Sequence, residues 1–467
     1  MMRHNRKNIE CELFVNVNKL WNLEELYSDL ANQKSTGREK KIELTSVEKA
    51  ILRGLLCNYS PKEIATALHW NSGSICVELT KGLYRYVEIL TGRESNSLKN
   101  WRDISIWLEA AGYKTLKPHQ DWGDAPELSV FYGRTSELQT LKQWITQQQC
   151  RLVAILGQAG IGKTTLAVKL AQEIQGEFKY IIWRSLRHAP PLNHLLIQLI
   201  QFLSNQQQCS LQEDTKVLIS RFTECLHQHR CLVVFDDAQI LMRSYTHAGQ
   251  YREGYEGYSD LLAQVGRERH QSCLVFNSRE KPMQMELLEQ ESPYIGSLKI
   301  NGLLPKEAQK ILTKNGLTGN IKELENLINL YQANPLALHI VTKTIDDLFD
   351  NKISDFLTWR QVIVPEPFQT KVIEQLNRLD DSEMQIISYL ARSRTPVVRE
   401  QLRHDIHLGS DSKLINALNS LERRSILEKI RERSQTFFTI SPVVMNVIRE
   451  HYNIDVPYST ARFLSST

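Results

Sequence analysis

The sequence predicts an α/β core, in which helices cover a parallel sheet, with helical regions on both sides of it along the chain. Short apolar runs alternate with helical ones between about residues 128 and 300, which is typical of parallel strands buried on both faces. A glycine-rich motif joins the first apolar run to a helix. Before residue 113 and after about residue 304 the apolar spacing is helical instead.

Length and composition are those of a multidomain globular protein. The 467 residues are too many for one core and indicate about three domains. Apolar content of 42% and charged content of 24% exclude a fibrous or wholly disordered chain. The 57 basic and 53 acidic side chains nearly balance, so net charge does not favour nucleic-acid binding. Any DNA contact needs a local basic patch.

The cysteines and the N-terminus favour a cytoplasmic location. The eight cysteines form no CxxC pair, and several lie in apolar runs, as reduced, buried thiols do. Residues 1–8 are basic but lack the apolar segment of a secretory signal. No apolar run approaches the roughly 18 residues of a membrane helix, so we expect no membrane span.

The N-terminal region is predicted to be all-α. Residues 1–40 contain one amphipathic stretch, Leu13–Leu30, and then a polar run, which indicates a loosely attached helix and a linker. Residues 41–113 are predicted to form a domain of about three or four short helices. Two of these, Pro61–Ala65 and Ser74–Leu83, are separated by a turn, which is the pattern of a helix-turn-helix.

This N-terminal domain resembles the helix-turn-helix of LuxR-type regulators. On DNA, the helix from Ser74 would lie in the major groove and expose Ser74, Glu78, Lys81 and Arg85. Two cations against one carboxylate make a weak surface for phosphate contacts. Two hypotheses remain: the domain is an adaptor that binds a protein partner, or it binds specific DNA.

Residues 114–127 have the composition of a linker. Pro118, Gly123 and Pro126 lie there among charged residues, so we place a domain boundary in this segment. The domain that follows, 128–300, contains the apolar runs expected to form buried strands. These are Leu152–Leu156, Tyr180–Trp183, Cys231–Phe235 and Cys273–Phe276.

A complete phosphate-binding motif, GxxxxGK[ST], occupies Gly157–Thr164. It follows a predicted strand and precedes a helical run, Thr165–Ile174, which is the context that such a loop requires. Glycines let the loop direct backbone N–H groups at a phosphate, Lys163 would reach the β- and γ-oxygens, and Thr164 would bind Mg²⁺. The residues expected to bind nucleotide are Gly157, Gly160, Gly162, Lys163, Thr164 and Thr165.

Polar residues end two further predicted strands. Asp236 and Asp237 follow the run that ends at Phe235, and we expect Asp236 to hold Mg²⁺ and Asp237 to orient or deprotonate the attacking water. Arg279 follows the run that ends at Phe276. Since ligands of open α/β sheets bind at the carboxyl ends of the strands, Arg279 is a candidate sensor of the γ-phosphate.

The C-terminal part is predicted to contain two more domains. Residues 301–369 form a helical subdomain, and residues 370–455 contain helices and a short hairpin, Leu427–Ile440. The last residues, 456–467, are expected to form a frayed tail.

The order of these motifs resembles the NB-ARC group of STAND nucleotide switches. The motifs are Phe131–Arg134, the phosphate loop, Val233–Asp237, Asn277–Arg279 and Ala333–Leu338. Two segments, Ala248–Tyr258 and His270–Cys273, resemble the cyanobacterial branch more narrowly. The N-terminal domain is likewise similar to the vWA-MoxR-associated helical domain found beside such modules.

The resemblance implies an α/β P-loop NTPase core with an AAA-like parallel sheet, a helical subdomain, a C-terminal winged helix and an N-terminal helix-turn-helix. It implies that ATP, ADP and Mg²⁺ bind, that Arg134 lies on the adenine and ribose side, and that Pro335 packs on the nucleotide. It also implies slow ATP hydrolysis and self-association of the active form.

Two departures from the family pattern concern the C-terminus. Many relatives have a Met-His-Asp segment whose histidine contacts ADP, whereas this chain has Ser441–Val447 there, without a histidine. Relatives usually continue into a β-propeller or helical repeats, so sensing would use another chain, or the sequence is a short or truncated form.

Three functions remain open at this stage. The first is an ATP/ADP-dependent signalling switch that controls self-association and the N-terminal adaptor. The second is a transcription regulator in which ATP gates an N-terminal DNA-binding domain. The third is a nucleotide-binding scaffold that does not hydrolyse ATP.

Overall fold

The structure is a computed structural model that divides into two compact units, Met1–Lys117 and Pro118–Thr467. The tail predicted at 456–467 lies outside the described residues. So do parts of the N-terminal helix and linker predicted at 1–40. The described residues are 14, 17, 21–35, 42–57, 59–114, 119–204, 213–314, 316–317, 319–359, 362–393, 395–432 and 435–452.

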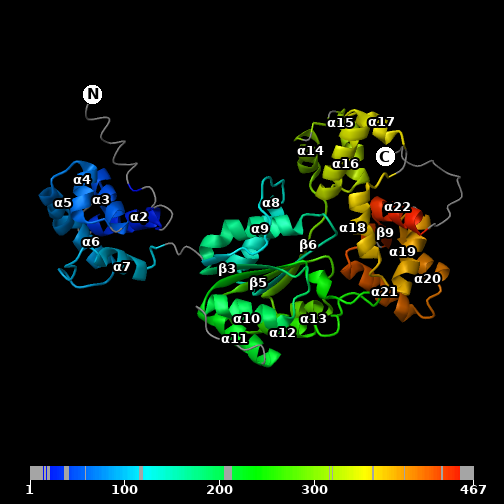
Figure 1. The fold of residues 1–467 in the computed structure, drawn as a ribbon, viewed down its shortest axis with the longest axis horizontal. Coiled ribbons are helices and arrows are strands. Elements are labelled where there is room, and N and C mark those ends of the chain that lie inside the picture. The colour runs from blue at the N-terminus through cyan, green and yellow to red at the C-terminus, as the bar shows by residue number, and fades with distance from the viewer. Residues whose placement is uncertain are drawn as a thin grey trace. The chain divides into compact units, whose positions relative to one another are not determined.

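The first unit is a helical domain around one apolar core (Figure 1). Helices α3 and α4 begin at capping boxes, Thr45 with Glu48 and Ser60 with Glu63, which satisfy free N–H groups of the first turn. Its elements are α2 (Leu23–Ser35), α3 (Ser46–Leu56), α4 (Pro61–Leu68), α5 (Ser72–Glu78), the π-helical turn η2 (Leu79–Leu83), α6 (Tyr84–Leu90) and α7 (Asp103–Ala110).

The helix α2 differs from its prediction as a loosely attached element. Leu26 and Leu30 are fully buried in the core of the unit, and the Lys34 ammonium lies 2.6 Å from the Glu48 carboxylate of α3. Its apolar stripe therefore packs on the other helices.

A six-stranded, all-parallel sheet forms the centre of the second unit, which confirms the predicted α/β core. The strand order is β1-β3-β4-β5-β2-β6. The four predicted strands are present as β2 to β5. The bounds are β1 (His119–Asp121), β2 (Leu152–Leu156), β3 (Tyr180–Ser185), β4 (Cys231–Asp236), β5 (Cys273–Ser278) and β6 (Ile295–Lys299).

Two strands lie outside the predicted set. β1 falls within the segment predicted as a linker and pairs with β3 at one edge of the sheet, and β6 pairs with β2 at the other. Both are poor in apolar residues, because an edge strand is covered less completely than a central one.

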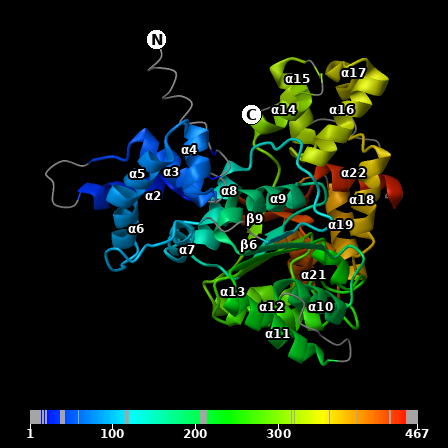
Figure 2. The same ribbon diagram turned by 60° about the vertical axis from the view of Figure 1, so that its left-hand side comes forward.

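Helices cover both faces of the sheet, as Figures 1 and 2 show. Alternate residues of β2 and β4 join different core clusters, one with each helix layer. One face carries α8 (Thr135–Lys142) with the π-helical turn η3 (Gln143–Gln147), and α9 (Lys163–Ile174) with the 3₁₀ turn η4 (Gln175–Glu177). The other carries α10 (Leu192–Leu203), α11 (Thr215–Gln228), the 3₁₀ turn η5 (Ala238–Leu241), α12 (Gly257–Arg267) and α13 (Met283–Glu291).

Two subdomains follow the sheet and share one apolar core. The helical subdomain contains α14 (Pro305–Lys314), α15 (Ile321–Leu330), α16 (Pro335–Phe349) and α17 (Ile353–Leu357). The C-terminal subdomain contains α18 (Glu366–Leu376), α19 (Asp381–Ser393), β7 (Val397–Val398), α20 (Arg399–Asp405), α21 (Asp411–Arg423), β8 (Leu427–Glu432), β9 (Gln435–Ile440) and α22 (Pro442–His451). Strands β8 and β9 pair antiparallel over the predicted hairpin, and β7 joins them.

None of the helices in the described part of the chain combines the length and apolar character needed to cross a membrane.

Candidate nucleotide site

The phosphate loop lies between β2 and α9, at the carboxyl edge of the sheet. Gly157, Gly160 and Gly162 have positive φ values of 153°, 73° and 99°. A Cβ atom on Gly160 would also lie 2.6 Å from the Leu336 Cβ. Both the positive φ and this overlap therefore exclude a side chain at this position. The loop thus curls at the positive end of α9, where backbone N–H groups favour an anion.

The Lys163 side chain is buried within the loop. Its Nζ donates hydrogen bonds of 2.9 Å to the backbone oxygens of Gly157 and Gln158. Burial and, to a smaller extent, the positive charge of Arg279 lower the pKa of Lys163 to about 7, while the carboxylates of Asp236 and Asp237 oppose the shift. The amine therefore lies among partners that carry no full negative charge, which a phosphate would supply.

Asp236 and Thr164 lie side by side beneath the loop. The Thr164 hydroxyl donates to the Asp236 carboxylate, with its Oγ1 2.9 Å from Oδ2, and the Asn277 amide donates to Oδ1 over 2.9 Å. Burial raises the pKa of Asp236, and the bonds from Asn277 and Thr164 oppose that shift. The Asn277 Oδ1 is buried without a hydrogen-bond partner. A cation at this position would relieve the desolvated carboxylate.

Asp237 has different contacts from Asp236. It adopts a left-handed backbone conformation with φ of 58°, and its carboxylate accepts a 2.8 Å bond from the Gln239 amide and a 3.4 Å bond from Arg187. Gln239 also accepts a 3.1 Å bond from the backbone N–H of Arg279. Gln239 thus joins the ends of β4 and β5. Sequence reasoning gave no role to Gln239, which belongs to no motif, and it included Asn277 in the motif that ends at Arg279 without assigning it a contact.

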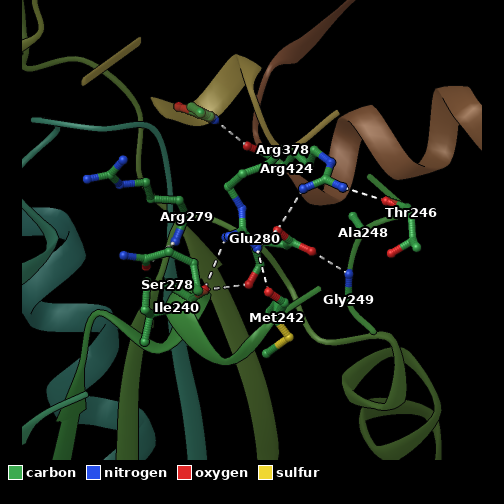
Figure 3. Close-up of polar contacts among 12 residues, drawn as sticks. Ile240, Met242, Thr246, Ala248, Gly249, Ser278, Arg279, Glu280, Arg378 and Arg424 are labelled. Atoms are coloured by element: carbon green, nitrogen blue, oxygen red, sulfur yellow. Dashed lines mark hydrogen bonds and ion pairs between the residues drawn. The ribbon is translucent and has the colours of Figure 1, made fainter. Parts of the chain in front are cut away.

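Arg279 lies between the phosphate loop and the C-terminal subdomain. Its charge acts on Lys163, and its guanidinium lies 3.8 Å from the Glu374 carboxylate of α18. Figure 3 shows the Arg279 side chain extending away from that of the adjacent Glu280. Arg279 thus faces both Lys163 and α18, whereas the Glu280 side chain points away from that of Arg279.

A cavity of about 410 Å³ opens beside the loop. Thr165 and Pro335 contribute to its wall, together with aromatic residues before α8. The remaining lining is Ser129, Val130, Phe131, Tyr132, Arg134, Ile161, Gly162, Leu303, Ile311, Lys314 and His339. Its largely apolar wall next to a phosphate cradle suits a purine base.

Arg134 lines this cavity, but protein groups hold its guanidinium. It pairs with Glu137 at 2.7 Å and donates to the backbone oxygens of Ile161 at 2.9 Å and Asn301 at 2.6 Å. The side chain is buried and fixes α8 against the loop. The contacts of its guanidinium are with protein groups, and the position on the adenine and ribose side that the resemblance implied stays a prediction.

The start of α16 packs directly on the phosphate loop. Asn334 caps this helix and donates a 2.9 Å bond to the backbone oxygen of Ala159, and the Leu336 N–H donates to Gly160 over 3.3 Å. Pro335 occupies the first helical position, where its missing N–H costs nothing. The sequence motif included Asn334 but did not reveal its bond to the loop.

Comparisons with known proteins agree with this site. Residues 134–294 match the NB-ARC domain. The chain is 39% identical over 371 residues to an uncharacterized WD repeat-containing protein of Nostoc sp., covering 77% of this chain and 29% of that protein. It is 25% identical over 179 residues to the disease resistance protein RPP2A of Arabidopsis thaliana, covering 37% of this chain and 13% of that one.

Among solved structures, the Walker-type ATPase PABY2304 of Pyrococcus abyssi aligns with a TM-score of 0.47 and 17% identity, over 68% of this chain and 96% of that one. The chain spans less than a third of the length of each curated relative above. The motif order, the parallel sheet and the family match lead to one conclusion: residues 134–294 are similar to the NB-ARC domain and contain a nucleotide-binding module of the P-loop NTPase type.

Proposed function

We propose that this chain is an ATP/ADP-dependent signal-transduction switch of the STAND type. In this proposal the C-terminal subdomain is a winged-helix domain that closes over bound ADP together with the helical subdomain. Exchange of ADP for ATP releases this closure and exposes surfaces for self-association. Slow hydrolysis returns the switch to its closed state.

One observation carries the proposal: three parts of the chain meet around a single phosphate cradle. The loop itself is contacted by Asn334 of the helical subdomain, and Arg279 at the end of β5 lies beside α18 of the C-terminal subdomain. A ligand with a variable number of phosphates can thus change what each subdomain contacts. A site built only for steady hydrolysis does not need this arrangement.

The residues present fit a magnesium nucleotide. Thr164 and Asp236 would hold Mg²⁺ through hydroxyl and carboxylate oxygens, the ligands that this ion prefers, with water and phosphate oxygens completing its shell. The ion would supply charge neutralisation between the terminal phosphates. Lys163 would bind the same oxygens, and Asp237 would orient the attacking water.

The first unit is proposed to be the adaptor of the switch, which binds a protein partner. On α5 the exposed residues include Ser74, Val77 and Glu78, and Val77 is 46% exposed. The Glu78 carboxylate on this face repels a phosphate backbone, which favours a protein partner over DNA. DNA binding by this unit is the competing hypothesis. Salt-dependent, sequence-preferring binding of the purified chain to duplex DNA would favour it.

The first experiment identifies the nucleotide that the purified protein carries. The protein is denatured, and the released nucleotide is separated by chromatography and quantified, with Lys163→Ala as the control. About one ADP per chain, lost in the variant, supports the closed switch. A site that is empty in the wild type contradicts stable closure on ADP. ATP that is bound but never hydrolysed would favour a scaffold instead.

A further inference from the structure

A group of buried charges joins the end of β5 to the C-terminal subdomain (Figure 3). Glu280 of the nucleotide-binding domain and Glu383 of α19 both contact Arg424, which follows α21. The side chains of Glu280, Glu383 and Arg424 are 3%, 0% and 2% exposed. Carboxylates and guanidinium groups are almost never buried this fully unless they are paired.

Arg424 lies between the two carboxylates. Its Nη1 lies 2.9 Å from the Glu280 Oε2, its Nε lies 3.0 Å from the Glu383 Oε1, and its Nη2 donates over 2.6 Å to the backbone oxygen of Thr246. A single cation thus joins the loop after β4, Glu280 in the segment after β5, and α19. Lysine has one nitrogen and cannot reach three such acceptors together.

A second arginine completes the group. The Arg378 Nη2 lies 3.1 Å from the Glu280 Oε2, and the backbone N–H of Gly249 donates over 2.6 Å to the other Glu280 oxygen. Two arginines therefore face two glutamates. We call Glu280, Arg378, Glu383 and Arg424 the charge clasp.

Backbone contacts align the two sides of the charge clasp. The Tyr245 N–H donates to the Arg378 backbone oxygen and the Lys281 N–H to that of Arg423, each over 3.0 Å. The Ala248 N–H donates over 2.5 Å to the Ser420 hydroxyl, which in turn donates to Glu383. The contact is thus specific in its geometry.

The charge clasp is joined covalently to the γ-phosphate sensor. Glu280 is the residue after Arg279, and the Ser278 hydroxyl donates over 2.6 Å to the Glu280 backbone oxygen and accepts from its N–H over 3.1 Å. These bonds fold the segment into a tight turn. A displacement of Arg279 toward a third phosphate therefore displaces Glu280 as well.

Buried charge pairs suit a contact that must open. Burial of these groups has cost them their hydration, and their mutual attraction offsets that cost only while every partner is in place. When the whole C-terminal subdomain lifts, both carboxylates and both arginines regain water together. An apolar contact of similar area would instead expose surface that gains nothing from water.

We propose that the charge clasp holds the C-terminal subdomain on β5 in the ADP state and separates when Arg279 binds the γ-phosphate. The proposal rests on the proposed switch function and assigns its regulation to Glu280. Glu280 is a positioning residue in this scheme, because it acts through Arg279 and touches no phosphate.

The test compares Glu280→Gln with Glu286→Gln. Glu286 pairs with Arg423 across the same boundary, but its side chain is 43% exposed. Dissociation of N-methylanthraniloyl-ADP and of a fluorescent non-hydrolysable ATP analogue is measured by stopped flow on the full chain. Glu280→Gln is expected to release the ADP analogue about tenfold faster, the factor that a buried charged hydrogen bond supports. It should leave release of the ATP analogue unchanged, and Glu286→Gln should change neither rate by more than about twofold.

Each outcome decides the proposal. Equal acceleration of both analogues by Glu280→Gln would mark a merely structural residue and overturn the charge clasp. Unchanged dissociation rates of both analogues in Glu280→Gln would also overturn the charge clasp. A wild type that binds neither analogue overturns the switch function itself, and the charge clasp with it. Should Glu280→Gln fail to fold, Arg424→Lys keeps the charge but loses contacts, and the same ADP-specific acceleration is expected.

Discussion

The nucleotide-binding domain is contacted by the helical subdomain and by the C-terminal subdomain, and the two contacts differ in chemistry. The helical subdomain contacts the phosphate loop through neutral groups, the Asn334 amide and the Leu336 N–H, with almost no space at Gly160. The C-terminal subdomain contacts Glu280 through two charged side chains, Arg378 and Arg424, and Arg424 also pairs with Glu383 of the same subdomain. The neutral contact forms a tight wall of the site and has no charge to hydrate, whereas the charged groups can exchange their partners for water.

The largest effect is expected at the charged contact. Arg424→Met leaves Glu280 and Glu383 buried without their shared cation, which costs about 3–5 kcal/mol. Hydrogen exchange should show that α21 and the loop after β4 lose protection. Arg423→Met, which removes the neighbouring arginine of the edge pair, is the control. An equal loss of protection in Arg424→Met and Arg423→Met would mean that the buried and the edge charges contribute alike to the contact.

A smaller but still large effect is expected at the neutral contact. Gly160→Ala requires φ of 73° from a residue with a Cβ, and that atom would meet Leu336 at 2.6 Å. Strain and overlap together cost about 3 kcal/mol, so nucleotide affinity should fall by about a hundredfold. Gly176→Ala is the control, since no heavy atom lies within 4 Å of a Cβ there. Calorimetric titration with ADP measures the affinity of both variants. An unchanged affinity in Gly160→Ala would mean that α16 does not pack this tightly on the phosphate loop.

Asn334→Ala should have a moderate effect. It removes the cap of α16 and the bond to Ala159, which together contribute about 1–2 kcal/mol. Asn320→Ala removes the equivalent cap of α15, which is a separate helix of the same subdomain. The midpoint temperature of thermal unfolding should fall in both variants, but only Asn334→Ala should weaken ADP binding. A similar loss of binding in Asn320→Ala would show that general stability, and not the loop contact, controls affinity.

The smallest effect is expected at the edge of the charged contact. Glu286→Gln breaks an ion pair whose carboxylate is half exposed, so the free energy of closure should change by less than about 1 kcal/mol. Limited proteolysis at low and high salt measures this. A larger, salt-dependent change would assign the closure to the edge pair and weaken the case for the charge clasp.

The same contrast explains what could be predicted from the sequence. The phosphate loop, Asp236 and strands β2 to β5 depend on contiguous residues, so a short pattern indicates them. Strand β1 is three polar or charged residues that pair only because β3 lies beside them. In the sequence, Glu280 and Arg424 look like any surface charges, and 144 positions separate them. The family resemblance placed Arg134 on the adenine and ribose side, but its contacts with Glu137 and two backbone oxygens join distant parts of the chain, which no motif indicates.

The three buried charges of the clasp, together with the partly buried Arg378, also give the closed state a characteristic response to heat. Warming makes the hydration of ions less favourable, so burying Glu280, Glu383 and both arginines becomes less costly at higher temperature. The stabilisation from burying apolar surface increases comparatively little over the same temperature range. Relative to its apolar core, the resting protein should therefore stay closed more firmly in a warm cell than in a cold one, so the concentration of ATP needed to open it rises with temperature.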